Sequence, residues 1–263
     1  MKNRLSERQI DFLRIRKYNR IIRVYQKRLI HYGKHIELFI YEKPKIILSR
    51  VGETHTRRFR KDAKRSESSA LRAKRSLLRL VEANVGQYGD SKPVFATLTQ
   101  KENQVSLPIS NRRFSEFIKR LNYELGMKLK YVAVPEFQKR GSVHFHIVFF
   151  NLPFLHVKKF EKIWGYGMTN VQLMKKANRT GAYLAKYFTK AVQDPRLYQK
   201  KAYFSSRGLK KPVDIFGGYE VDEFLRGVTI KEVHHKNYNG LIYKKYVNAT
   251  QQRPLSISRR KIF

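Results

Sequence analysis

The sequence of 263 residues contains no cysteine, which excludes a disulfide framework, thiolate zinc ligands and a cysteine nucleophile. No apolar run approaches the ~18 residues of a membrane-spanning helix. The longest, around residues 147–155, is interrupted by Asn151 and Pro153. The first 16 residues are too charged for a signal peptide. There is neither a GxxxxGK[ST] loop nor a GxGxxG motif after a strand, so we expect a cytoplasmic protein without an ATP or dinucleotide site.

Acidic residues are scarce. There are 20 Asp and Glu against 57 Lys and Arg, which gives a formal net charge of +37. Such an excess repels itself in a compact chain and persists more easily beside a polyanion. Nucleic acid is therefore the first expected partner and an anionic membrane surface the second. Hydrophobic residues make up 41% of the chain, which is enough to build a folded core.

The first 60 residues are predicted to form a basic, mainly helical extension that binds DNA. Apolar residues recur near helical spacing between Glu7 and Ile30. A solvated charged face over a small core explains the same pattern. The extension ends in an exposed basic segment, whose DNA-binding candidates are Arg57, Arg58, Arg60 and Lys61.

Residues 61–215 alternate between helical and strand patterns and predict one α+β domain with a central antiparallel sheet. Helices are expected at 66–83, 111–125, 157–164 and 181–192, with Ser110 or Asn111 capping the second helix. Strands are expected at 94–99, 129–137, 143–150 and 169–174. Residues 216–263 are predicted to form short strands and a basic tail.

His144 and His146 are two residues apart on a predicted strand, so both imidazoles project from the same face of the sheet. The hairpin turn at 138–142 folds Glu136 back beside them. Two histidines and a carboxylate with open coordination positions suit Mn²⁺ or Mg²⁺ bound to a phosphate oxygen. Alternatively, the histidines are polar residues on a wet sheet face, and Glu136 pairs with Lys139 or Arg140.

Tyr183 and Tyr187 are i,i+4 neighbours on a predicted helix, and each has a lysine three residues on, Lys186 and Lys190. A phenol is a poor nucleophile near neutral pH, but a nearby cation or a metal-bound phosphate favours the phenolate. By itself, the pattern is more typical of an amphipathic helix whose tyrosines cover the core. Thr97 and Thr99, on the strand at 94–99, are expected to support the sheet structurally.

In chain order, the Phe-x-Thr-Leu-Thr strand, the His-Phe-His pair and the Tyr-x-x-Lys-Tyr helix resemble the three motifs of the HUH endonuclease superfamily. The match is to rolling-circle replication initiators of bacterial plasmids and single-stranded DNA phages. The string VPEFQKRGSVHFH at residues 134–146 is similar to theirs, as are Trp164-Gly165 and the segment at 206–212. The resemblance covers about residues 70–212, and residues 1–60 and the tail carry no assigned motif.

The resemblance implies a palm-like antiparallel sheet with the histidine pair in its middle and the tyrosine helix packed across it. It implies Glu136, His144 and His146 as metal ligands and Tyr187, with Tyr183 as its partner, as nucleophile. Lys186 and Lys190 would orient the phosphate or steady the phenolate, and Lys139 and Arg140 would contact DNA.

The implied reaction is the nicking and joining of single-stranded or hairpin origin DNA through a 5′-phosphotyrosine. The free 3′-OH would then be used by a DNA polymerase of a bacterial host, with a host helicase for unwinding, and no membrane is involved.

Two alternatives remain open. A single-strand transposase of the same superfamily would keep the metal pair and the order of the motifs. A conjugative relaxase would place its tyrosine before the histidines, which disfavours it here. A non-catalytic basic protein could instead stack bases on sheet aromatics such as Phe145, but would leave Glu136, His144 and His146 without a role.

Overall fold

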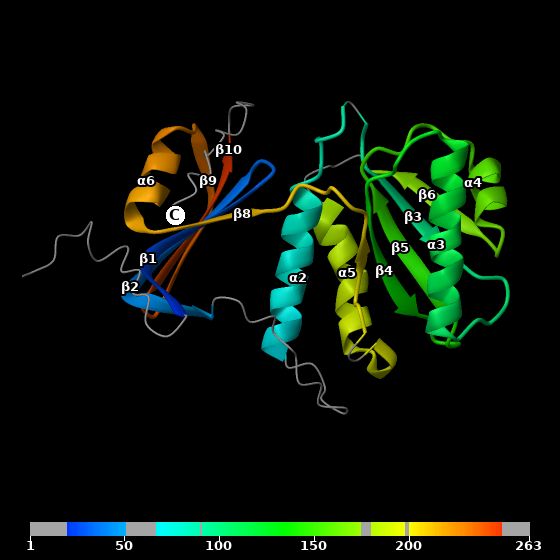
Figure 1. Ribbon diagram of the computed structural model, residues 1–263, viewed down its shortest axis with the longest axis horizontal. Helices are drawn as coiled ribbons and strands as arrows, with labels where there is room; N and C mark the ends of the chain where they lie inside the picture. Colours follow the sequence, from blue (N-terminus) through cyan, green and yellow to red (C-terminus); the bar gives the residue numbers. More distant parts are fainter. Residues whose placement is uncertain (1–19, 51–66, 90, 175–179, 198–199, 249–263) are drawn as a thin grey trace, which may run out of the picture. The chain divides into compact units, whose positions relative to one another are not determined.

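The computed structural model describes residues 20–50, 67–89, 91–174, 180–197 and 200–248 (Figure 1). The chain divides into two compact units. Residues 57–212 form one, and residues 1–56 together with 213–263 form the other. The predicted DNA-binding residues Arg57, Arg58, Arg60 and Lys61 lie outside the described residues, as do residues 1–19 and the C-terminal tail.

The unit of residues 57–212 is built on an antiparallel five-stranded sheet in the order β6-β3-β5-β4-β7. This confirms the predicted α+β fold, and β5, which carries the histidine pair, is the central strand. The elements in chain order are α2 (Glu67–Glu82), β3 (Val94–Leu98), α3 (Leu107–Glu124), β4 (Tyr131–Phe137), β5 (Val143–Phe149), α4 (Val157–Trp164), β6 (Thr169–Leu173), α5 (Thr180–Gln193), a 3₁₀ turn (Pro195–Leu197) and β7 (Phe204–Ser205).

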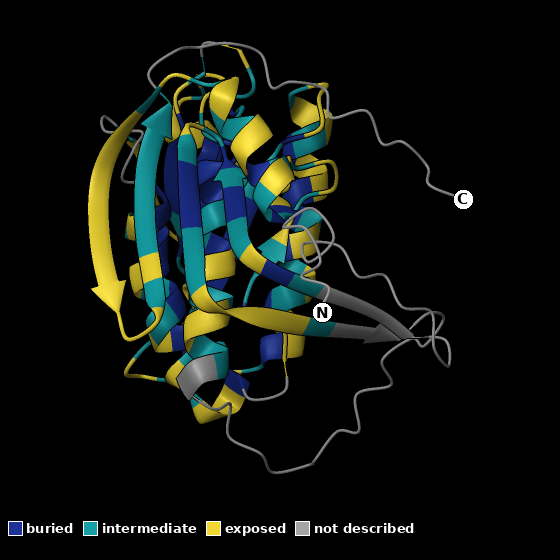
Figure 2. Ribbon diagram, turned by 90° about the vertical axis from the view of Figure 1, so that its left-hand side faces the viewer, coloured by how far each residue is buried: buried dark blue, intermediate teal, exposed yellow. Residues whose placement is uncertain are grey.

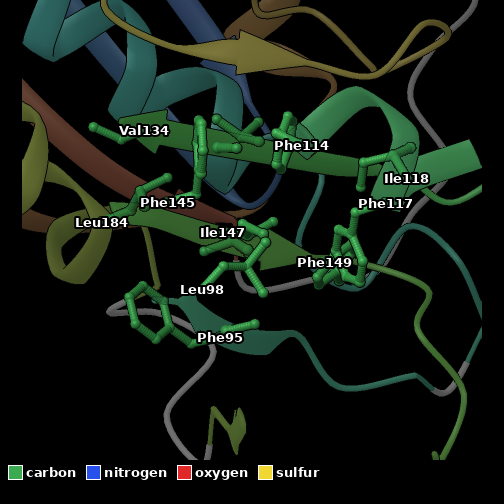
Figure 3. Packing of buried hydrophobic residues seen from close by; sticks show 14 of the residues in the cluster. Phe95, Leu98, Phe114, Phe117, Ile118, Val134, Phe145, Ile147, Phe149 and Leu184 are labelled. Atoms are coloured by element: carbon green, nitrogen blue, oxygen red, sulfur yellow. The ribbon is translucent and has the colours of Figure 1, made fainter. Parts of the chain in front are cut away.

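Helices cover both faces of this sheet, because all of β5 is buried (Figure 1). On one face Phe145 stacks on Phe114 of α3, with ring centroids 4.7 Å apart (Figure 3). On the other face α5 packs across β4 and β5. Alternation along a strand therefore sends the odd-numbered apolar residues of β5 toward α3 and its two histidines toward α5.

Helix α5 reaches the sheet with α2 at its side, and the two helices meet closely at Gly181. A Cβ at this position would lie 2.7 Å from Glu82 Oε1 and 3.1 Å from the Leu78 carbonyl oxygen. The Gly181 N–H donates to Glu82 Oε1 at 2.8 Å. Glycine thus sets how closely the first turn of the tyrosine helix approaches α2.

The unit of residues 1–56 and 213–263 contains a second antiparallel sheet in the order β8-β1-β2-β10-β9. Helix α6 packs on β1 and β8 over a small core formed by Leu29, Ile36, Leu38, Ile215 and Val221. Strand β9 is exposed along nearly its whole length (Figure 2). The elements are β1 (Arg20–Tyr32), β2 (His35–Arg50), β8 (Val213–Phe216), α6 (Gly218–Arg226), β9 (Ile230–Tyr238) and β10 (Leu241–Asn248).

The predicted N-terminal helix is wrong over residues 20–30, which belong to β1. A two-residue turn at Gly33-Lys34, with Gly33 at φ 57°, returns the chain so that β2 pairs with β1. Apolar spacing alone did not separate a helix from this long strand. Residues 1–60 and 216–263 were also expected to be separate segments, whereas β1 and β2 share one sheet with β9 and β10.

Two details of the helix predictions also change. Helix α3 begins at Leu107 with Ser106 as its N-cap, earlier than the expected cap at Ser110 or Asn111. Pro108 in its first turn allows the earlier start, because the first turn of a helix needs no donor from proline. Gly126 does follow the helix in a left-handed conformation, at φ 61°.

Candidate active site

Strand register brings Glu136, His144, His146 and Thr97 onto the face of the sheet that α5 covers. Glu136 lies directly opposite His144, and Thr97 lies directly opposite His146. Directly opposed residues project from the same face of a sheet. The sheet therefore assembles a carboxylate, two imidazoles and a hydroxyl from three adjacent strands.

Both nitrogens of His146 have partners. Nε2 is 2.6 Å from Glu136 Oε2, a diagonal contact between β5 and β4, and Nδ1 is 3.2 Å from Thr97 Oγ1. A carboxylate accepts, so Nε2 carries the proton in this contact. In the neutral ring, Nδ1 then accepts from the Thr97 hydroxyl.

Glu136 has a second partner, because Lys190 Nζ on α5 donates to its Oε1 at 3.0 Å. Partial burial raises the pKa of this carboxyl group, but the hydrogen bonds from His146 and Lys190 outweigh burial and leave the pKa below its ordinary value. Glu136 is therefore an ionised, acceptor-only group. The alternative pairing with Lys139 or Arg140 is not the one found.

His144 is buried, and its Nε2 has no hydrogen-bond partner among the described residues. Burial, together with the charges of His146 and Arg140, lowers the pKa of His144 to about 4, although Glu136 acts in the opposite direction. The side chain is therefore neutral near pH 7, and its buried Nε2 is left without a partner. A buried polar atom without a partner is costly and is uncommon outside functional sites.

The described residues contain no group of three or more His, Cys, Asp and Glu side chains already arranged around a metal position. The contact between Glu136 Oε2 and His146 Nε2 accounts for this, since two donor atoms in a mutual hydrogen bond leave no room for an ion between them. The chemistry of the set nevertheless fits a divalent cation: it has one ionised carboxylate and one neutral imidazole with a buried, unused nitrogen.

Both tyrosines lie at this site. The Tyr187 ring stacks on His146 with centroids 3.7 Å apart, and its hydroxyl oxygen is 3.5 Å from that of Tyr183. Phe95 of β3 stacks on Tyr187 at 5.6 Å and meets Tyr183 edge-on at 4.7 Å. Sequence reasoning missed this role of Phe95, because it is an ordinary apolar residue of a β strand.

The environment of Tyr187 disfavours its phenolate. Burial, the hydrogen bond with Tyr183 and the negative charges of Tyr183 and Glu136 raise the pKa of Tyr187 to about 12. Lys190 Nζ is 5.9 Å from the Tyr187 ring centroid, but it is engaged with Glu136. Lys186 Nζ is 5.4 Å from the Tyr183 ring centroid. The expected help from these lysines thus does not outweigh burial as the chain stands.

An open hollow of about 760 Å³ lies beside Glu136 and Lys190. The exposed hairpin residues Lys139 and Arg140 line it, as does Asp194 at the end of α5. Arg196 holds the pKa of Asp194 below its ordinary value, mainly through their hydrogen bond. Asp194 belongs to no motif, so sequence reasoning missed it.

The base-stacking alternative placed Phe145 on an exposed sheet face, and this is wrong. Phe145 has no exposed surface and is covered by α3. A buried ring cannot stack on a nucleobase.

Residues 93–192 match the model of a family described as replication-associated proteins of the ORF2 type. The matched segment contains all of the side chains described above except Asp194 and Arg196. The similarity supports a role in the initiation of DNA replication. No curated protein and no solved structure gave a match. No helix in the described part of the chain is long and apolar enough to cross a membrane.

Proposed function

We propose that this protein is a rolling-circle replication initiator of the HUH type, which nicks and rejoins single-stranded DNA at an origin through a tyrosine. One observation carries the proposal. Two tyrosines with adjacent hydroxyls lie against a Glu–His–His cluster in a solvent-open hollow. A match to replication-associated proteins favours an initiator over a transposase with the same motifs.

In the proposed reaction the Tyr187 hydroxyl oxygen attacks the scissile phosphorus, and the bond from phosphorus to the 3′ oxygen breaks. The phenolic proton leaves toward Tyr183, its acceptor in the structure, and on to solvent. The 3′ oxygen takes a proton from water and becomes a free 3′-OH. The strand stays attached through a 5′-phosphotyrosine, which a second attack can reverse.

Positioning is the main contribution of the fold to this reaction. Helix α5 holds Tyr187 against His146, so the nucleophile is presented without a separate encounter. Lys190 would turn from Glu136 toward the phosphate, since its side chain is largely exposed and can move. A phosphate beside Tyr187 and Lys190 would then change the charge balance that now keeps the pKa of Tyr187 high.

Glu136, His144 and His146 are the proposed ligands of Mn²⁺ or Mg²⁺. Such a cation supplies positive charge at a phosphate oxygen and so stabilises the charge that develops in the transition state. The unpartnered Nε2 of His144 supports this assignment. For it to apply, Glu136 and His146 must exchange their mutual hydrogen bond for contact with the cation, and Thr97 would then accept from His146 Nδ1.

The proposed partners follow from the products. A free 3′-OH is a primer for a host DNA polymerase, and unwinding would come from a host helicase, because the sequence carries no nucleotide-binding loop. The proposed substrate is single-stranded or hairpin origin DNA in the cytoplasm of a bacterial host.

A covalent adduct assay tests the proposal. Labelled single strands that tile the DNA on both sides of the coding sequence are incubated with protein and Mn²⁺, then resolved on a denaturing gel. We expect one strand to form an adduct with the wild type, none with Tyr187→Phe, and a first cut without efficient rejoining with Tyr183→Phe. Tyr123→Phe is the matched control, because Tyr123 is 90% exposed on α3.

Two results would reject the proposal. One is the absence of an adduct on every strand tested, with protein that is folded and binds DNA. The other is an undiminished adduct with the double variant Tyr183→Phe/Tyr187→Phe.

A further inference from the structure

A second hollow, of about 920 Å³, lies between the end of β3 and helix α4. Its floor is backbone, since the Thr99 N–H donates to the Met168 carbonyl and the Lys101 N–H to the Tyr166 carbonyl. Gly167 at the floor has φ 149°, and a Cβ there would lie 2.5 Å from Lys101 N and from Thr99 O. Only glycine fits such a close approach of two backbone segments.

The walls of this hollow are held in place by buried side chains. The Trp164 indole N–H at the end of α4 donates to the Thr99 carbonyl at 2.9 Å. Arg120 of α3 donates to the Ile163 and Trp164 carbonyls, which closes the last turn of α4. The hollow is therefore a built feature of the fold rather than a gap between mobile loops.

Four cations and one carboxylate line the hollow. The cations are Lys101, Arg140, Lys158 and Lys162, and the carboxylate is that of Glu161. On α4, Lys159 faces away and pairs with Glu124 at 2.5 Å. Across the described ranges, Lys101, Lys158 and Lys162 form no ion pair. Unpaired cations gathered in a concave site attract an anion of matching size, such as a phosphate.

Arg140 lines both hollows, this one and the one beside Glu136 and Lys190. Its guanidinium is fixed by donation to Gln138 Oε1 at 3.0 Å and to the Gln100 carbonyl at 3.2 Å. The ridge between the two hollows is thus a positioned cation. A strand that lies on the candidate active site has a charged path across this ridge.

We propose that the basic hollow at α4 binds the phosphates of single-stranded DNA on one side of the scissile bond, with Arg140 holding the strand where it crosses from the candidate active site. The inference rests on the proposed function for the identity of the strand. The polyanion matches the excess of cations, and Met168, which is 71% exposed at the rim, offers an apolar surface to a base.

Equilibrium binding of a fluorescein-labelled oligothymidylate of about 16 nucleotides tests this site without cleavage. The probe is measured by anisotropy against the full chain over a range of salt concentrations. We expect Lys158→Ala/Lys162→Ala to bind about tenfold more weakly at low salt. The slope of log affinity against log salt should fall in magnitude by about 1.4, since each lost single-strand phosphate contact removes about 0.7.

Two further variants make the result interpretable. Glu161→Gln removes the one carboxylate of the hollow and should tighten binding, a gain that misfolding cannot produce. Lys92→Ala/Lys128→Ala is the matched control. Both of these exposed lysines precede strands β3 and β4, at the end of the sheet away from the hairpin, and the same net charge is lost. We expect this control to bind like the wild type.

The outcomes separate the two proposals. Equal affinity and salt slope for the wild type and Lys158→Ala/Lys162→Ala overturn the hollow as a DNA site. An equal loss with Lys92→Ala/Lys128→Ala overturns it as well, since only bulk charge would then matter. A selective loss of binding in a protein that forms no covalent adduct on any origin strand keeps the hollow and rejects the nuclease function.

Discussion

His146 contacts three groups of different chemistry: a carboxylate at Nε2, a hydroxyl at Nδ1 and an aromatic ring on its face. Each contact comes from a different element, namely β4, β3 and α5. The imidazole is therefore fixed in position and in tautomer before any ligand arrives. Such supporting contacts commonly decide the affinity of histidine ligands for a metal.

Thr97→Val tests this support at the scale of one hydroxyl. The variant keeps the shape of the side chain but leaves His146 Nδ1 without its partner. We expect the free energy of unfolding to fall by about 1 kcal/mol, and Mn²⁺ affinity, measured by calorimetry, to fall about tenfold.

Thr99→Val is the control for this variant, because the Thr99 hydroxyl forms no hydrogen bond within the described part of the chain. If both variants lower Mn²⁺ affinity equally, the contact between Thr97 and His146 has no special role in positioning the ring.

At the scale of elements, the tyrosine helix depends on how closely α5 approaches α2. Gly181→Ala adds a Cβ that meets Glu82 Oε1 and the Leu78 carbonyl. We expect a loss of about 1–3 kcal/mol in the free energy of unfolding, because overpacking outweighs the gain in helix propensity. Urea unfolding followed by Trp164 fluorescence measures it.

Ala182→Gly, at an exposed neighbouring position on α5, provides the comparison. It should cost about 0.5–1 kcal/mol from propensity alone. A Gly181→Ala protein that is as stable as the wild type, or more stable, would show that α5 can move away from α2 without loss.

Strand β1 carries a pH-sensitive group in His31, which lies against Phe224 of α6. Burial lowers the pKa of His31, although a hydrogen bond to the Gly33 backbone acts in the opposite direction. The unfolded chain then binds the proton more readily than the folded chain. The contribution of His31 to stability is present above about pH 6.5 and is lost as the pH falls below it.

His31→Gln should therefore flatten the dependence of unfolding free energy on pH between about pH 7 and pH 5, relative to the wild type. Urea unfolding followed by circular dichroism at several pH values measures the difference. His234→Gln, at an exposed position of β9, should keep the wild-type dependence. Identical pH dependence in His31→Gln and the wild type would contradict burial as the cause of the shift.

At the scale of the whole molecule, the charge of +37 predicts how DNA binding responds to salt. With ~6–10 phosphate contacts, affinity should fall by roughly 10³–10⁵ between low and moderate salt. Filter binding or anisotropy over this range measures it. Cleavage of a strand that is already bound should change far less. A flat salt response would show that few of the cations face DNA.

Both units contribute to this charge, yet the family match lies within residues 93–192. The β unit formed by the two ends of the chain therefore has no assigned role from similarity. The predicted helical extension is wrong over β1, because the partner that makes this segment a strand is the hairpin return at Gly33 and, beyond it, β10 from the other end of the chain. Pairing between distant segments cannot be inferred from the spacing of apolar residues.

By itself, the sequence determined the absence of thiol chemistry, the excess of positive charge, the α+β alternation and the order of the motifs around Glu136, His146 and Tyr187. These follow from composition and local periodicity, which each segment carries alone. Only the tertiary structure decided that Lys190 pairs with Glu136, that Phe95 and Thr97 support the site, and that Arg140 lies between two hollows. Each of these depends on strand register and helix packing, which join residues far apart in the chain and are set by the core as a whole.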